Sequence, residues 1–419
     1  MGFTKERSTQ AQRSILAVFF LQAIIAATQI PRIPEIIKQI DVDFTTWGLI
    51  TGIAGVGGLL GLMFTSKFIA KYGTKQISII GSLGGAISLA SIGFIHDPVT
   101  YFIVTFANGL LYSIFNIALN SQTVALQKAL NRVVIGKFHA AWALGAAFAA
   151  AFSGFMATLL PLSIHLLLTG IATIIALLIF TRGMLTNSED GHGQGKTQKK
   201  SVSFFKSPGQ VWILAGGLFT GVLGEVAMMD WSALLGRDTL LLDAGRGAIP
   251  YTGFSIALIV GRTLINPLGK RWHLSSISRF AGIMSAIAIA AAITIAPPFA
   301  ADQPDLALFL TTFFFVIAGL GCAPMVPSFM SAAGHVAGLN TAQVLARMSL
   351  VNSVAIMIVK ILMGRTAEDF GVQYAFVFAV GGMFISGILA GVVAKRAKTQ
   401  ESPANSYPAT GAMQIVSED

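Results

Sequence analysis

The strongest constraint on the fold is a succession of long apolar segments. A helix that crosses the hydrocarbon core of a bilayer needs about 20 mostly apolar residues. Only 11% of this sequence is charged, whereas a soluble domain has about 25% charged residues. The sequence therefore predicts an all-α polytopic membrane protein with twelve transmembrane helices, near residues 14–34, 46–66, 77–95, 101–124, 138–159, 163–182, 209–235, 248–268, 277–299, 306–330, 342–363 and 373–394.

A polar stretch at residues 184–207 divides the apolar body into two halves of six segments each. Thr-Gly pairs open the second segment of both halves, at Thr51 and Thr252, which are 252 − 51 = 201 residues apart. Six plus six spans around a long connector is typical of transporters built from two repeats. We expect two pseudo-symmetric six-helix bundles, at 14–183 and 208–395. The remaining segments are expected to be a cytoplasmic N-terminal tail at 1–13, a cytoplasmic linker at 184–207 and a disordered cytoplasmic tail at 396–419.

The net charge of +10 raises the question of nucleic-acid binding. With the N-terminus in the cytoplasm, 21 of the 28 Lys and Arg residues fall in loops on the same side. This asymmetry is the positive-inside rule, and it places both termini and the linker in the cytoplasm. The charge is spread over alternate loops as a topology signal, so no nucleic-acid partner is expected.

Signals for an enzyme or a metal protein are absent from the sequence. It contains no paired histidines at metal-ligand spacing and no Gly-x-Ser-x-Gly. The one cysteine, Cys322, excludes an internal disulfide. We expect no catalytic residue, no metal and no cofactor.

Several short motifs together resemble the major facilitator superfamily, and more closely uncharacterised bacterial inner-membrane permeases of its fucose-permease-like branch. The resemblance covers about residues 14 to 395. It is carried by Arg32-Ile-Pro-Glu-Ile36, Asn120, Phe138-His-Ala-Ala-Trp-Ala-Leu-Gly145, Gly224-Glu225, Asp230-Trp231, Gly261-Arg262, Gly319-Leu-Gly321 and Pro327. It implies a monomeric secondary transporter of the bacterial cytoplasmic (inner) membrane, in which spans 1, 4, 7 and 10 line a central path.

The sequence departs from the resembled pattern at three places. The loop Ala70 to Lys75 keeps the glycine and the base but lacks the usual acid. Asn116 stands where related permeases often carry an acid, and Lys360 stands where they are apolar.

Glu225 is the strongest candidate for chemistry because it is the only acid well inside an apolar segment. An acid at that depth is expensive to ionise without a partner, so intramembrane acids are candidate proton carriers. We interpret Glu225 as the proton-coupling residue, with a structural hydrogen bond as the alternative. Asp230 does not share its helix face, since five residues advance a helix by about 140°, and a gating or capping role is favoured. Trp231 is assigned to the same gate, or to an aromatic belt at the membrane interface.

Arg262 lies in the eighth span. It has three interpretations: it reaches the aqueous interface, it locks the two halves on the inner side, or it holds a substrate carboxylate. A direct pair with Glu225 is compatible with the sequence but not implied by it. Arg32, His139 and Trp142 are assigned gating or structural roles. Lys360 is interpreted as a base that reaches the outer surface.

A polar stripe marks the fourth span. Asn108, Tyr112, Asn116 and Asn120 recur every four residues, so they form a slowly drifting face that must meet protein or water. Gln22 and Gln29 form a matching face in the first span, and Asn352 lies in the eleventh. We interpret these seven residues as substrate-binding, with hydrogen bonding between helices as the alternative.

These features favour a secondary transporter that moves a small polar, sugar-like solute by alternating access, with proton coupling as a hypothesis. The expected partners are this solute, the proton and the lipid bilayer. Two alternatives stay open, namely proton-driven efflux of amphipathic drugs and a non-transporting membrane sensor or scaffold.

Overall fold

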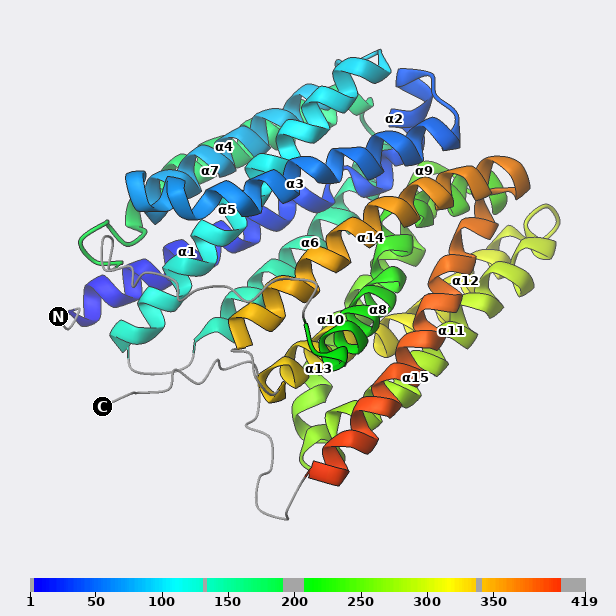
Figure 1. Ribbon diagram of the computed structural model, residues 1–419. Coiled ribbons are helices and arrows are strands. Elements are labelled where there is room, and N and C mark those ends of the chain that lie inside the picture. The colour runs from blue at the N-terminus through cyan, green and yellow to red at the C-terminus, as the bar shows by residue number, and fades with distance from the viewer. Residues whose placement is uncertain (1–3, 131–133, 191–206, 337–340, 401–419) are drawn as a thin grey trace.

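The computed structural model describes residues 4–130, 134–190, 207–336 and 341–400. Every element in this part of the chain is a helix, and twelve helical segments are long and apolar enough to cross a membrane. The expectation of an all-α membrane protein with twelve transmembrane helices is therefore confirmed (Figure 1).

The first half contains the helices α1 (Lys5–Ala27), η1 (Ile30–Arg32), α2 (Ile33–Ile40), α3 (Phe44–Tyr72), α4 (Thr74–Ile92), α5 (Pro98–Leu130), α6 (Ile135–Ala157), α7 (Leu162–Phe180) and η2 (Thr181–Gly183). The second half contains α8 (Gly209–Leu234), η4 (Leu235–Thr239), α9 (Ala244–Gly247), α10 (Ile249–Gly269), α11 (Leu274–Ile295), η5 (Pro297–Phe299), α12 (Pro304–Cys322), α13 (Met325–Ala332), η6 (Ala333–His335), α14 (Thr341–Phe370), η7 (Val372–Phe376) and α15 (Val377–Gln400).

Two helix boundaries differ from the expectation. Helix α1 begins at Lys5 and not near residue 14, because Thr4 caps it by accepting from the backbone N–H of Arg7. Helix α15 continues to Gln400, past the expected end of the second bundle. The tail expected to be disordered lies, beyond this helix, outside the described residues.

The first part of the linker is packed against the first bundle. Met184 and Leu185 are buried, and the backbone N–H of Leu185 donates to the Gln122 side chain over 2.8 Å. Glu189 accepts from Arg7 over 2.6 Å. The expected linker therefore begins as an ordered cover of the first bundle, and its residues 191–206 lie outside the described part.

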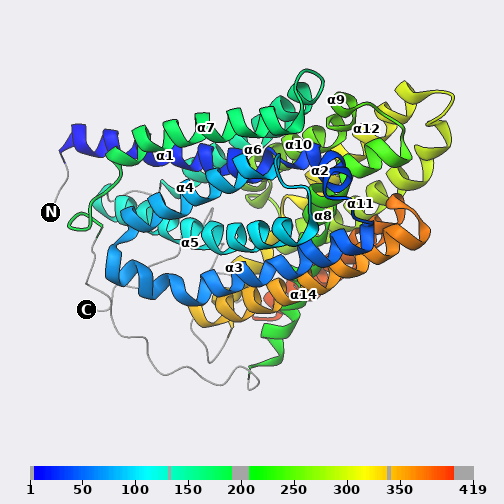
Figure 2. The same ribbon diagram turned by 90° about the horizontal axis from the view of Figure 1, so that it is seen from above.

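The two bundles meet at one end and separate at the other (Figure 1). We call the end where α1 begins and α15 finishes the terminal end, and the opposite end, where α2 and α9 lie, the closed end. Helices α3 and α14 run side by side (Figure 2), and Gly48 allows α3 to reach the backbone of α14. A Cβ added at Gly48 would lie 2.7 Å from the carbonyl oxygen of Lys360, so this closed-end contact requires glycine.

The second contact between the bundles joins α6 to α9 and α10, also at the closed end. Gly154 of α6 faces Ala248, where an added Cβ would lie 2.5 Å from the alanine methyl. Phe44 donates its backbone N–H to Glu368 over 2.9 Å and lies edge-on to Trp231. Small residues and a shared aromatic contact thus seal the closed end.

Candidate functional site

An ion pair joins α8 and α10 inside the second bundle. Arg262 Nη2 lies 3.0 Å from Glu225 Oε1 and 3.2 Å from Oε2, so the guanidinium donates to both carboxylate oxygens. The side chains are 22% (Glu225) and 36% (Arg262) exposed, so the pair is partly open at its surface. The pair with Glu225, which the sequence left open, is therefore present, and in this conformation the carboxylate held by Arg262 belongs to the protein.

Three further groups lie near this pair, one from α10 itself and two from other helices. The phenol of Tyr251 in α10 is buried and close enough to sense the charge of Glu225. The buried Cys322 at the end of α12 senses both charges of the pair. His139, from α6 of the first bundle, senses the charge of Arg262. The surroundings of the pair thus include α6 of the first bundle.

A second ion pair lies nearer the closed end. Lys360 Nζ of α14 is 2.8 Å from Asp230 Oδ2 of α8. The expectation that Lys360 extends to the outer surface is therefore wrong, because its ammonium group finds a half-buried carboxylate on the neighbouring helix. Tyr101 of the first bundle senses the charge of Asp230. Asp230 thus lies at the junction between the bundles.

Trp231 is a buried component of the closed end. It is 1% exposed and packs edge-on against Phe44, with ring centroids 6.1 Å apart. The alternative of a lipid-facing aromatic belt is wrong, since such a ring would be exposed. The location fits the proposed gate.

The polar stripe of α5 divides between two environments. Asn120 donates its amide to the carbonyl oxygen of Asn116 over 2.8 Å and to the side-chain oxygen of Asn116 over 3.1 Å. Tyr112 interacts with Trp142 of α6. All four side chains are half-buried, and the three from α5 lie on successive turns of one accessible face of that helix.

Asn108 lies apart from that face. Its Oδ1 is buried 3.6 Å from the Cβ position of Gly85 in α4, without a hydrogen-bond partner among the described residues. Four residues along a helix turn the face by about 40°, so the drift carries Asn108 toward α4. The assignment of Asn108 to the same surface as Asn116 is therefore not supported by its position.

The amides of the other spans are also buried. Gln22 is 0% exposed, and neither its oxygen nor its nitrogen has a hydrogen-bond partner in the described part of the chain. The side-chain oxygens of Gln29 and Asn352 are likewise buried and unpaired within the described ranges. In this conformation Gln22 lies inside the first bundle and a solute does not reach it.

Arg32 occupies the break between α1 and α2. Only 1% of its side chain is exposed; it pairs with Glu35 over 2.6 Å and donates to the carbonyl oxygen of Leu160 over 3.1 Å. This geometry fixes the closed end of the first bundle. His139, expected at the terminal end of its helix, is exposed and lies edge-on to Phe19 at 5.6 Å.

A recess opens at the terminal end of α5. It encloses about 400 Å³, and its polar lining comes from Asn116, Asn120, Ser121, Lys128 and Asp190. Asp190 comes from the start of the linker and accepts from the Thr74 hydroxyl at the N-terminus of α4. The loop that lacks an acid in the sequence thus receives one from residue 190.

Sequence reasoning missed several of these residues. Tyr101, Tyr251 and Asp190 gave no sequence signal, because their importance depends on charges that come from distant helices. His165 gave a weak signal, as a histidine in an apolar segment. It is buried near Arg32, and neither ring nitrogen has a partner among the described residues.

Within the described ranges, no group of three His, Cys, Asp or Glu side chains is arranged to hold a metal ion. The polar groups that the structure does bring together are the two ion pairs, the amides of α5 and the buried phenols.

Comparison with known proteins agrees with this architecture. A family model of the Major Facilitator Superfamily matches residues 15–313. An uncharacterized transporter of Sinorhizobium fredii is 25% identical over 386 residues, covering 91% of this chain and 96% of that protein. An uncharacterized transporter of the same type from Yersinia pestis is 26% identical over 330 residues, covering 77% of this chain and 80% of that protein.

Solved structures show the same fold. The nucleoside transporter NupG has a TM-score of 0.72 at 14% identity, covering 91% of this chain and 99% of its own. An inward-facing, occupied bacterial homolog of the human lysosomal transporter Spinster has a TM-score of 0.68 at 13% identity, covering 96% of this chain and 100% of its own.

Proposed function

The chain belongs to the Major Facilitator Superfamily and is a multi-pass membrane transporter, and on that premise we propose that it moves a small polar, sugar-like solute by alternating access. The observation that carries this proposal is the asymmetry of the two bundles. They are sealed by Gly48, Gly154 and Trp231 at one end and separate at the other. Polar groups between them are then accessible from one side at a time, as alternating access requires.

The chemistry of the accessible face supports a neutral solute. In the first bundle this face carries Tyr112, Asn116, Asn120 and Trp142, which offer hydrogen-bond donors and acceptors without charge. The neighbouring charges are of both signs: Glu225 and Arg262 pair with each other, and the recess at Asn116 and Asn120 also contains Lys128 and Asp190. Hydroxyl-rich solutes match such a lining, because each hydroxyl needs a donor or an acceptor. Gln22, Gln29, Asn108 and Asn352 would join the site only after the helices move.

Proton coupling through Glu225 is part of the proposal. Protonation would remove the negative member of the Glu225–Arg262 pair and leave Arg262 uncompensated. Since Arg262 and His139 of the first bundle would carry the same sign of charge, an uncompensated Arg262 would alter the electrostatic repulsion between the bundles. Asp230, Trp231 and Arg32 would hold the closed end during this step, with His139 and Trp142 as gating contacts.

We further propose that the terminal end faces the cytoplasm of a bacterial inner membrane, as the positive-inside rule indicates. The structure would then be an inward-open state of a monomer. Membership in the fucose-permease-like branch stays a prediction.

A ligand screen tests the function. The purified protein is heated with sugars, sugar acids, nucleosides, peptides and amphipathic drugs, and solutes that raise its unfolding temperature are tested for counterflow in liposomes. Nucleosides are included because NupG, which shares the fold, is named a nucleoside transporter. We expect a neutral hydroxylated solute to give both signals, and Asn120→Ala to weaken its binding relative to a Ser91→Ala control, whose hydroxyl donates to the Ser88 carbonyl oxygen of its own helix α4. Stabilisation by drugs alone would favour efflux, and neither stabilisation nor flux would favour a sensor.

A further inference from the structure

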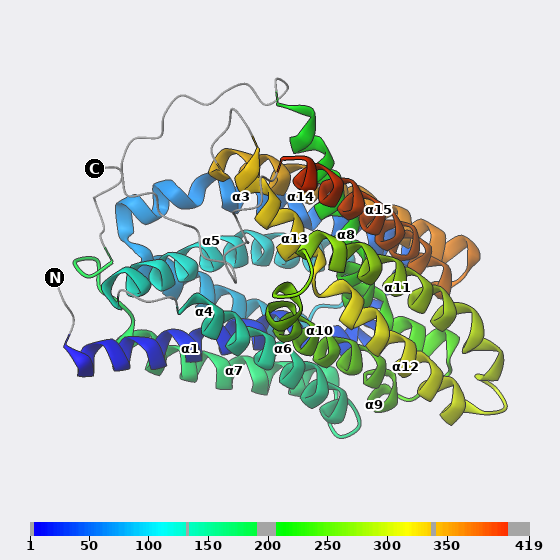
Figure 3. The same ribbon diagram turned by 90° about the horizontal axis from the view of Figure 1, so that it is seen from below.

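An apolar groove lies on the outside of the second bundle, between α10 and α11. Both helices pack closely on α12: an added Cβ at Gly261 of α10 would lie 2.6 Å from Ala323, and one at Gly321 would lie 2.7 Å from Ser285 of α11. Helices α10 and α11 contact each other much less than they contact α12. Side chains of all three helices line the groove, and Figure 3 shows α12 next to both α10 and α11.

The groove has the size of a ligand site and an entirely apolar lining. It encloses about 630 Å³, within the range of about 300–1,000 Å³ typical of ligand pockets. Its lining includes Leu264, Leu268, Phe280, Met284 and Phe314. Along α11 it extends from Ile277 to Ala288, a rise of about 16 Å. One leaflet of the hydrocarbon core is about 15 Å thick, so the groove matches the depth of one leaflet.

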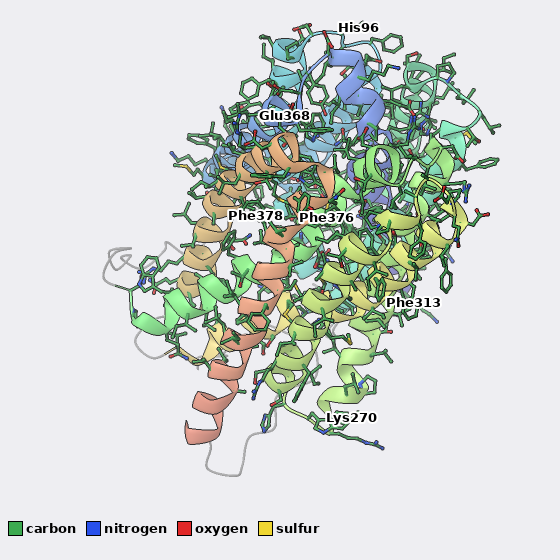
Figure 4. The ribbon with its side chains drawn as sticks, turned by 90° about the vertical axis from the view of Figure 1, so that its right-hand side faces the viewer. His96, Lys270, Phe313, Glu368, Phe376 and Phe378 are labelled. Carbon is green, nitrogen blue, oxygen red and sulfur yellow. The ribbon has the colours of Figure 1, made fainter. Side chains whose placement is uncertain are left out.

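Two cations stand at the terminal mouth of this groove. Lys270 and Arg271 follow the last lining residue of α10, Leu268, and both are exposed. Lys270 extends away from the helices at the opposite end of the molecule from Glu368 (Figure 4). The two cations at the end of the groove match a negatively charged lipid headgroup, and the apolar groove, about as long as one leaflet is thick, matches a long acyl chain.

We propose that this groove binds an anionic phospholipid, with an acyl chain between α10 and α11 and the phosphate held by Lys270 and Arg271. Arg262 follows the lining residue Gly261 directly, so it lies about 100° around the same helix turn. The lipid therefore supports the segment of α10 that presents Arg262 to Glu225. The inference does not depend on which solute is carried.

Native mass spectrometry of the full chain tests the lipid site. The protein in detergent is mixed with equal amounts of phosphatidylglycerol and phosphatidylcholine, and retained lipid is counted. We expect preferential retention of one phosphatidylglycerol. Replacing both cations, in K270Q/R271Q, should weaken its binding about 20- to 30-fold. Met284→Trp should also reduce retention by filling the groove. Wild-type unfolding temperatures without lipid would show that the variants are folded.

The matched control is K67Q/K71Q. Lys67 and Lys71 are also exposed at the terminal end, each over an aromatic ring of α3. This variant should retain the lipid as wild type does. Equal retention of the two lipids, or unchanged retention by both K270Q/R271Q and Met284→Trp, would overturn the proposal. Displacement of the lipid by free glycerol phosphate at equal concentration would also overturn it, because the acyl chain would then contribute nothing.

Discussion

Arg262 of α10 donates to both carboxylate oxygens of Glu225 in α8, at 3.0 and 3.2 Å. The two residues are 37 positions apart in the sequence and belong to consecutive predicted spans. Because the pair lies inside the membrane body, each charge depends on the other for its stabilisation.

A double-mutant cycle measures this dependence. We expect Glu225→Gln and Arg262→Gln each to lower stability by roughly 1–2 kcal/mol, because each leaves one partly buried charge without its partner. The double variant should lose less than the sum of the two. The measurement is the unfolding temperature of the purified proteins. Additive losses would show that the pair contributes no coupling energy.

The ion pair between Asp230 and Lys360 predicts that a second substitution restores stability lost by the first. Asp230→Asn leaves the half-buried Lys360 ammonium group without its carboxylate, and we expect a loss of roughly 2 kcal/mol. Removing the other charge as well, in D230N/K360M, should restore most of this loss in a thermal unfolding assay. If the double variant is less stable than Asp230→Asn, the Lys360 charge has another partner.

The closed-end contact between α3 and α14 depends on Gly48. Gly48→Ala places a methyl 2.7 Å from the Lys360 carbonyl oxygen, so the helices must separate there and the bundles should rock toward the other conformation. Gly58→Ala, on the same helix, meets its first neighbour only at 3.7 Å and serves as the control.

Spin labels on Lys67→Cys and Lys270→Cys, in a Cys322→Ser background, report the separation of the bundles at the terminal end. We expect Gly48→Ala to add a shorter distance to the distribution and Gly58→Ala to leave it unchanged. Identical distributions for both variants would mean that the glycine contact does not set the conformation.

The ion pair between Arg7 and Glu189, which holds the first part of the linker on the first bundle, predicts that stability depends on pH. The hydrogen bond from Arg7 lowers the pKa of Glu189 from 4.5 to about 2. A depressed carboxyl pKa stabilises the folded state above the unfolded pKa, and this contribution is lost as the pH falls toward the folded pKa. The difference in unfolding temperature between wild type and Glu189→Gln should be full at neutral pH. It should shrink below about pH 4.5. A difference that does not change with pH would contradict the assigned pair.

The sequence was sufficient for the architecture but not for the side-chain partners. Twelve apolar segments predict twelve helices, because a bilayer allows few other structures for such runs. The sequence separation of Asp230 and Lys360, 360 − 230 = 130 residues, carries no signal of contact. The sequence also could not decide whether Glu225 and Arg262 form a pair. Helix rise gives the depth of each residue within its own span, but not how far one span is shifted along its axis relative to the next.

The polar stripe of α5 shows the same limit within one helix. A spacing of four residues keeps side chains on neighbouring faces but turns them by about 40° each time. Asn116 and Asn120 therefore share the accessible surface, whereas Asn108 turns toward Gly85 of α4. Periodicity identified the polar face but could not show where it passes from the accessible surface into the interior of the bundle.

The most direct test of the proposed mechanism is solute accumulation in liposomes under an imposed pH difference, using the solute found in the ligand screen. The wild-type protein should accumulate it against its concentration gradient. Glu225→Gln should bring it only to equilibrium while keeping counterflow, since the solute site is intact but the proton carrier is gone. Accumulation by Glu225→Gln to the wild-type level would contradict coupling through Glu225.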